Sequence, residues 1–102
     1  MPKFYITWQL DPARIPSDPE ERVKVWLAAC EMTKADLKTW AKDWGMCAGG
    51  SCGYGIAEAA NETELMAQLI KYMPSVVFQV NPVLTVDQVI AAVKKAVAAA
   101  KK

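Results

Sequence analysis

Two cysteines, Cys47 and Cys52, lie in the glycine-rich segment 45–55 and offer the clearest chemistry in the chain. Gly49 and Gly50 lie between them and suit a two-residue hairpin turn, because glycine tolerates the backbone angles of tight turns. This turn predicts that the cysteines face each other as a non-hydrogen-bonded pair, with Cα atoms about 4.5 Å apart. Such a distance is compatible with a disulfide. The pair is therefore a candidate redox site.

The redox state of these thiols depends on the compartment. With Cys30 the chain has three cysteines, an odd number, and the N-terminus lacks a basic flank followed by an apolar segment of the signal-peptide type. We therefore expect a cytoplasmic protein with reduced thiols. The chain contains no histidine, the commonest zinc ligand in proteins. We predict neither a metal site nor a cofactor.

The candidates for acid or base chemistry are few. Glu58 ends a predicted strand, while Tyr5 and Tyr54 lie within strands. A carboxylate needs burial or a charged neighbour to shift its pKa into a catalytic range. Because the sequence shows neither, the three residues are catalytic candidates only, and Glu58 is better explained as a solvent-exposed strand end or as part of the cap of the following helix.

Composition excludes several classes of protein. The chain has 102 residues, 53% of them hydrophobic, and a net charge of +1. A chain of this length forms one domain, residues 1–102. The near-neutral charge argues against nucleic-acid binding, and no apolar run approaches the length of a membrane span.

The first element that would position these residues is a strand over Lys3–Leu10, whose side chains alternate between two faces. The apolar Phe4, Ile6 and Trp8 are expected to face the helices. The open face then carries Tyr5, Thr7 and Gln9, joined by Val77 and Gln79 from the last strand, so that these five side chains are the predicted lining of a ligand site.

A helix is predicted to begin near Pro19, capped by Ser17 or Asp18, with Val23, Trp26, Leu27 and Cys30 as its buried stripe. A second helix is predicted from Thr33, where Thr33–Asp36 resembles a capping box. Its stripe would include Leu37, Trp40, Ala41 and Trp44. Whether residues 19–44 form one kinked helix or two remains open. In either case Trp40 and Trp44 are predicted to lie over the mouth of the ligand site.

The remaining elements alternate in type. The pattern predicts a strand from about Cys52 to Glu58, a helix capped by Asn61 and ending before Pro74, a strand over 76–80 that extends towards Leu84, and a C-terminal helix capped by Thr85 and Gln88. The order β-α-β-β-α-β is that of the ferredoxin-like fold, an α+β fold with a four-stranded antiparallel sheet, here followed by a C-terminal helix.

A sheet with helices on one face leaves its other face uncovered. Because that face is half polar and half apolar, we expect a second copy of the chain to cover it and to enclose a partly hydrated cavity. The expected partner is therefore the chain itself, as a homodimer.

Three short segments resemble the DUF3303 family of small proteins: residues 3–8 (KFYITW), 55–59 (GIAEA) and 81–84 (NPVL). The resemblance implies a dimeric α+β barrel. The region 11–44 is longer than the family pattern, and the two-cysteine hairpin departs from it. No catalytic residues transfer with the resemblance, and the isomerases and monooxygenases of the same superfamily are an analogy of fold alone.

These observations favour a homodimer that binds a small, partly apolar molecule at the sheet. Two alternatives remain. The first is an isomerase or cofactor-independent monooxygenase on the same fold, and the second is a thiol redox or interaction module centred on Cys47 and Cys52.

Overall fold

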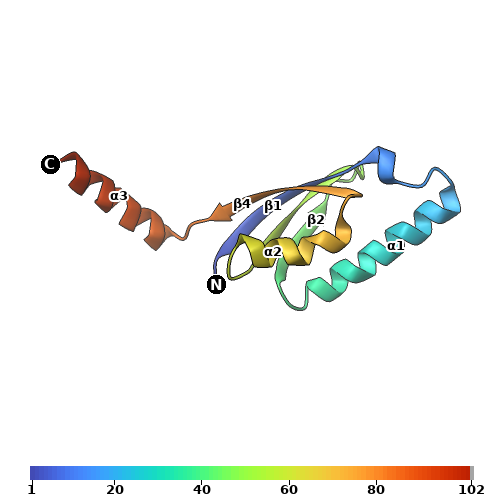
Figure 1. Ribbon diagram of the computed structural model, residues 1–102, viewed down its shortest axis with the longest axis horizontal. Coiled ribbons are helices and arrows are strands. Elements are labelled where there is room, and N and C mark those ends of the chain that lie inside the picture. Colours follow the sequence, from blue (N-terminus) through green and yellow to red (C-terminus); the bar gives the residue numbers. More distant parts are fainter. Residues whose placement is uncertain (102) are drawn as a thin grey trace.

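The computed structural model describes residues 1–101 and has the α+β architecture expected of a ferredoxin-like chain (Figure 1). Its sheet has four strands in the order β2-β3-β1-β4, and every neighbouring pair is antiparallel. The elements are β1 (Lys3–Leu10), α1 (Pro19–Asp36), β2 (Ala41–Met46), β3 (Cys52–Glu58), α2 (Glu62–Leu69), β4 (Val76–Val83) and α3 (Val86–Ala100), with short 3₁₀ helices η1 (Pro12–Arg14) and η2 (Ile70–Tyr72).

Strand β1 lies in the middle of the sheet and organises the core. Its side chains alternate as predicted, with Phe4, Ile6 and Trp8 buried. Helix α2 covers this face and contributes the buried Leu65 and Leu69 to the same cluster. The caps predicted for two helices are confirmed, because Asn61 accepts from the backbone of α2 and Thr85 forms a capping box with Gln88 at α3.

Helix α1 begins where predicted, with Asp18 accepting a hydrogen bond from the Glu21 amide. The predicted buried stripe is wrong at two of its four residues, because Val23 and Leu27 are more than half exposed, whereas Trp26 and Cys30 face the sheet. The face turned towards the sheet is instead lined by Val25, Trp26, Ala29, Cys30 and Thr33. Asp36 is the one buried residue of this helix. Helix α1 therefore stands off the sheet and leaves a space beneath its inner face.

The second helix predicted from Thr33 is also wrong. The Thr33 hydroxyl donates to the Ala29 carbonyl at 2.9 Å, inside the continuous helix α1. After a turn at 37–40 the chain forms β2, in which Trp44 pairs with Gly55 of β3. A bulge between Ala41 and Asp43 interrupts the alternation of β2. Because the bulge adds one residue to the strand, the stripe residues Ala41 and Trp44 are three positions apart in sequence, which is the spacing of a helix rather than that of a regular strand.

The outer face of the sheet is uncovered. Thr7 pairs with Gln79 and Gln9 with Val77, and paired residues of antiparallel strands share a face. Tyr5 lies on the same face as Thr7 and Gln9, as predicted. The expectation that a second copy covers this face to form a barrel stays a prediction.

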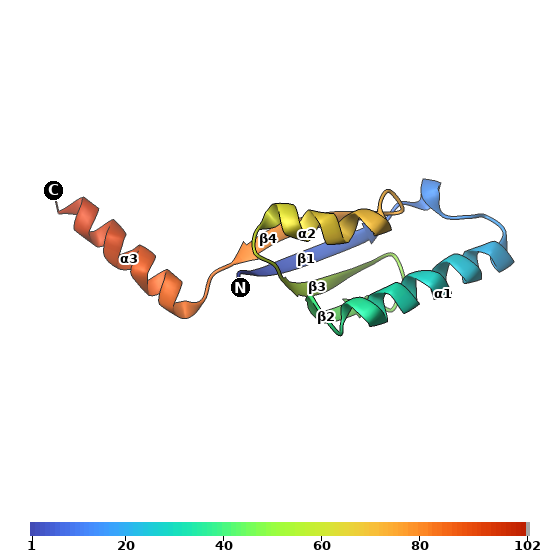
Figure 2. The same ribbon diagram turned by 60° about the horizontal axis from the view of Figure 1, so that its bottom comes forward.

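Helix α3 projects away from the sheet (Figures 1 and 2), which gives the molecule a length of 65 Å against 25 and 24 Å in the other directions. Among residues 1–101, no helix combines the length and the apolar character needed to cross a membrane.

Candidate functional site

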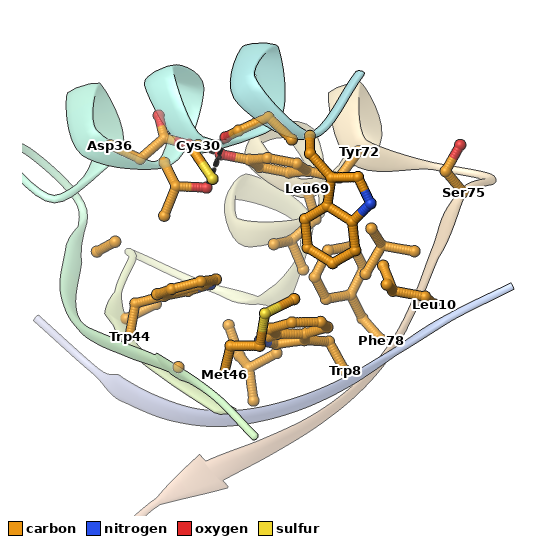
Figure 3. A pocket seen from close by; sticks show the side chains of 18 of the residues that line it. Trp8, Leu10, Cys30, Asp36, Trp44, Met46, Leu69, Tyr72, Ser75 and Phe78 are labelled. Atoms are coloured by element: carbon orange, nitrogen blue, oxygen red, sulfur yellow. Dashed lines mark hydrogen bonds between the residues drawn. The ribbon is translucent and has the colours of Figure 1, made fainter. Parts of the chain in front are cut away.

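A cavity of about 230 Å³ lies between the inner face of α1 and the helix-covered face of the sheet. Figure 3 shows it from close by, with side chains from strands and helices pointing inwards. Most of the lining side chains are apolar, and the charged ones are Arg14, Asp36 and Asp43. The apolar and aromatic ones include Ile6, Trp8, Leu10, Ile15, Val25, Trp26, Ala29, Cys30, Trp40, Trp44, Met46, Leu69, Tyr72, Val76 and Phe78.

The floor of the cavity is an aromatic pair. The rings of Trp8 and Trp44 stack with centroids 5.7 Å apart and an angle of 12° between their planes. Trp8 fits flat against β3 because residue 53, directly opposite it in the ladder, is a glycine. Its indole N–H donates to the Tyr54 carbonyl at 3.4 Å. The stack is thus held by the register of three strands.

A polar cluster stands at one end of the cavity and fastens α1 to the rest of the protein. Asp36 is 7% exposed and accepts a hydrogen bond from the Tyr72 hydroxyl at 2.5 Å and one from the Lys71 ammonium at 2.7 Å. Thr33 lies 3.4 Å from the same hydroxyl. We call these four residues the Asp36 cluster. Asp36, Thr33 and Tyr72 line the cavity, so this corner carries a carboxylate that a lysine already neutralises.

Burial, with the hydrogen bond to Asp36 as a second cause, raises the pKa of Tyr72 to about 12. An ionised phenolate would lose its solvation and face the Asp36 carboxylate, so the folded state keeps the proton. At neutral pH, Tyr72 is therefore a hydrogen-bond donor and is poorly suited to act as a general base.

This pKa predicts a loss of stability in alkali. The unfolded chain releases the tyrosine proton near pH 10, whereas the folded chain retains it to pH about 12. The stabilisation is fully present below pH 10 and is lost as the pH rises through 12. Urea unfolding between pH 9 and 12 should show a steeper decline for the natural chain than for Tyr72→Phe. Parallel declines would contradict the assignment.

One further polar atom beside the cavity is unusual. The indole nitrogen of Trp40 is buried and has no hydrogen-bond partner among the described residues. An unpaired buried donor costs free energy. Trp40 lines the cavity, as does Trp44, so these two of the predicted ligand-binding residues lie beside it.

The other five predicted lining residues lie elsewhere. Tyr5, Thr7, Gln9, Val77 and Gln79 occupy the uncovered face of the sheet, opposite to the cavity. Their burial alternates with that of the cavity-facing residues along both strands. The sequence thus indicated a ligand space at the sheet, and the structure has its cavity on the other side.

The three acid–base candidates are separate from the cavity as well. Glu58 lies at the end of β3 and pairs with Lys42 at 3.9 Å. Tyr54 donates a hydrogen bond to Asp43 at 3.1 Å on the uncovered face, and this bond raises the pKa of Tyr54. Tyr5 is exposed on the same face. None of the three is among the residues that line the cavity.

The cysteine pair is brought together as predicted, with the Sγ atoms of Cys47 and Cys52 3.0 Å apart. Two details of the prediction are wrong. The Cys47 amide donates to the Cys52 carbonyl at 2.8 Å, so a backbone hydrogen bond joins the two residues. The Gly50 amide donates to the Cys47 carbonyl at 2.8 Å, which puts Ala48 and Gly49, and not Gly49 and Gly50, at the centre of the turn. The hydrogen bond between the thiols raises the pKa of Cys47.

Sequence reasoning missed Asp36 and Tyr72 as site residues. Asp36 was assigned to a helix cap, and Tyr72 lay unmarked between the helix pattern and Pro74. The available signal was the position of Asp36 at the C-terminal end of α1, where a negative charge is unfavourable beside the negative end of the helix dipole unless it has a partner.

The family model described as Domain of unknown function (DUF3303) matches residues 2–97. A search of curated proteins found no match.

Proposed function

This chain belongs to the DUF3303 family, a domain of unknown function, so we infer its role from its own site. We propose that it binds a small, uncharged, flat molecule in the cavity beneath α1. The observation that carries this proposal is an apolar, aromatic-lined cavity that the protein's own side chains leave unfilled. The cavity is partly open to solvent, because the lining residues Val25 and Trp44 are 46% and 38% exposed. A concave apolar surface of this kind is typical of small-molecule sites.

The size of the cavity limits the ligand. A dry engineered cavity of roughly 150 Å³ admits one benzene ring, and this cavity is about 230 Å³. The volume therefore suits two fused rings or a similar small molecule. The indole rings of Trp8 and Trp44 are nearly parallel, with 12° between their planes. Together they offer a flat aromatic surface at the floor of the cavity on which such a ring system can lie.

The charges of the lining limit the ligand further. Lys71 neutralises Asp36, so the corner of the cavity attracts neither anions nor cations strongly. Arg14 also lines the cavity but pairs with Asp11 at 4.0 Å, and the Asp43 carboxylate accepts a hydrogen bond from Tyr54 on the uncovered face. A charged ligand would therefore lose its hydration without a free counter-charge in the cavity. A single hydroxyl or carbonyl group would instead find partners in the Asp36 cluster. We expect an uncharged molecule with one polar end.

Filling the cavity from α1 is the direct test. Ala29 lines the cavity, and its neighbour Ala28 is exposed on the outer side of α1. We expect isothermal titration with 2-naphthol to detect binding to the natural chain, and Ala29→Phe to weaken it at least tenfold because the added ring occupies the space. The matched variant Ala28→Phe should bind as the natural chain does.

Two results would contradict the proposal. The first is the absence of binding for 2-naphthol and for indole, the second probe of similar size. The second is an equal effect of the two alanine variants, which would place binding outside the cavity.

The enzyme alternative has less support. The candidates Glu58, Tyr5 and Tyr54 do not line the cavity, and the raised pKa of Tyr72 argues against a base at neutral pH. The buried Asp36 carboxylate beside the cavity is a feature that would favour an enzyme, but Lys71 and Tyr72 already hold it by hydrogen bonds. An isomerase or monooxygenase activity stays a prediction.

A second candidate function, thiol redox sensing, rests on the contact between Cys47 and Cys52. Oxidation by a hydroperoxide would join the two sulfur atoms and convert the peroxide into an alcohol and water, since both thiol protons and two electrons pass to it. The raised pKa of Cys47 predicts a slow reaction, because the thiolate is the reactive form.

Thiol counting tests this candidate. After treatment with hydrogen peroxide, maleimide labelling followed by mass spectrometry should show that Cys47 and Cys52 are protected and that Cys30 still reacts. In Cys47→Ser no disulfide within the hairpin can form, so Cys52 should react with maleimide without any reductant. Two cysteines that stay open to maleimide in the natural chain would eliminate the sensor.

A further inference from the structure

The polar end of the ligand can be a hydroxyl or a carbonyl group as far as charge is concerned, and the hydrogen atoms of the Asp36 cluster separate the two. Three side chains of this cluster line the cavity with oxygen atoms: Thr33, Asp36 and Tyr72. A ligand can donate to them where a lone pair is free, and can accept from them only where a hydrogen is free. The direction of each existing hydrogen bond therefore determines which kind of ligand fits.

The single hydroxyl hydrogen of Tyr72 is already in use. It points to the Asp36 carboxylate, with the two oxygen atoms 2.5 Å apart. A carboxylate has no hydrogen to offer, so the tyrosine is the donor of this bond. The raised pKa of Tyr72, about 12, keeps the hydrogen in place at neutral pH. Tyr72 therefore offers lone pairs to a ligand, but no hydrogen.

The hydroxyl hydrogen of Thr33 is in use as well, since it is donated to the Ala29 carbonyl at 2.9 Å. Asp36 accepts from Tyr72 and from Lys71, and its carboxylate can accept further bonds but cannot donate. Lys71 has hydrogens left, but it is not among the residues that line the cavity. This corner of the cavity therefore accepts hydrogen bonds and has no donor of its own.

The N–H and S–H groups nearest to this corner do not replace the missing donor. The Trp8 indole N–H is taken by a backbone carbonyl. The Trp40 nitrogen is unpaired but buried, so a ligand would reach it only if the indole ring turned. Figure 3 shows Cys30 close to Asp36, and a thiol is only a weak donor.

The remaining donors of the lining lie away from the corner. Trp26 and Asp36 are ten positions apart in α1, which is about 15 Å along the helix axis. Ser75 lies on the opposite side of the cavity from Asp36 (Figure 3). Arg14 pairs with Asp11 outside α1. A ligand whose polar end lies against the Asp36 cluster therefore has to bring its own hydrogen.

We propose that the ligand is an aromatic hydrogen-bond donor, an uncharged ring system with one O–H or N–H group such as a phenol or an indole, and that this group donates to the Asp36 cluster. This assignment rests on the proposed binding of a flat molecule in the same cavity and names the class of that molecule. Aromatic ethers, ketones and quinones only accept hydrogen bonds. They would set one acceptor against others and leave buried oxygen atoms unpaired, and sites of this kind discriminate strongly.

Two pairs of ligands of similar shape test the proposal. Indole and benzofuran differ at one ring position, which is N–H in indole and oxygen in benzofuran. The second pair is 2-naphthol and 2-methoxynaphthalene, in which a methyl group replaces the hydroxyl hydrogen. In isothermal titration the natural chain should bind the donor of each pair at least about tenfold more tightly, which is the effect of one hydrogen bond to a charged group.

Asp36→Asn tests the part played by the carboxylate, because the amide that replaces it brings two N–H hydrogens of its own. The preference for indole over benzofuran should fall below about threefold. Loosening of α1 would weaken both ligands alike, so the ratio separates a polar role from a structural one. Glu58→Gln is the matched control, since it makes the same change in a lysine-paired carboxylate outside the cavity and should keep the ratio of the natural chain.

The outcomes distinguish failure of this proposal from failure of ligand binding itself. If benzofuran and 2-methoxynaphthalene bind as tightly as indole and 2-naphthol, the cavity takes flat molecules without selecting a donor, and this proposal alone is overturned. Tighter binding of benzofuran would overturn it too and would point to the Trp40 N–H as the ligand's partner. An unchanged ratio in Asp36→Asn would remove the Asp36 cluster from the assignment. If neither donor binds the natural chain, both proposals fail, and the ratios of the natural chain decide even if Asp36→Asn does not fold.

Discussion

Replacing Gly53 with alanine is expected to destabilise the fold by about 2–3 kcal/mol and to abolish binding in the cavity. A Cβ atom at residue 53 would collide with the backbone carbonyl of Gly45 and with the ring of Trp8. The carbonyl belongs to the neighbouring strand and cannot turn aside. Either β3 moves away from β2 or Trp8 leaves its stack with Trp44, and both changes remove the floor of the cavity.

Gly55→Ala is the matched control, because Gly55 lies two residues further along the same face of β3. There the added Cβ would meet the Asp43 carbonyl at 3.6 Å and the Ile6 Cβ at 4.0 Å, which are ordinary contacts. Neither Gly53 nor Gly55 has a positive φ angle, so the two substitutions differ in available space alone. Urea unfolding should place Gly55→Ala within about 0.5 kcal/mol of the natural chain, and an equal loss for both variants would contradict the packing described at Gly53.

Replacing Asp36 with alanine is expected to cost about 2–3 kcal/mol and to loosen α1. Asp36 is the buried acceptor for Tyr72 and Lys71, and it joins the end of α1 to η2. Without it the tyrosine hydroxyl loses its partner, while the partly exposed lysine can turn to water. Urea unfolding measures the cost, and hydrogen exchange of the α1 amides reports the loosening.

Asp43→Ala provides the comparison for Asp36→Ala. Asp43 also accepts a hydrogen bond from a tyrosine, Tyr54, but on the uncovered face of the sheet. Exposed polar pairs contribute little to stability, so this variant should lose less than about 1 kcal/mol. Faster exchange in α1 should follow Asp36→Ala alone. If the two aspartate variants proved equally stable, Asp36 would not be the attachment point of α1.

Features that depend on neighbouring residues were predictable from the sequence. The alternation of β1 predicted which side chains are buried, because successive side chains of a strand point to opposite faces. Asn61 and Thr85 predicted the starts of α2 and α3, because each cap bonds an amide three residues away. The opposition of Cys47 and Cys52 followed from the turn between them.

Features that depend on partners distant in the sequence were decided by the tertiary structure. Segment 41–46 has the spacing of a helix, but β3 offers it a ladder of hydrogen bonds, so that a bulged strand forms instead. Asp36 and Tyr72 are separated by 36 positions and meet because α1 and η2 end beside each other. The cavity exists because α1 is fastened at Asp36 and otherwise stands off the sheet. Its place beneath α1, opposite to the face that the sequence indicated, follows from packing between elements, which local patterns do not encode.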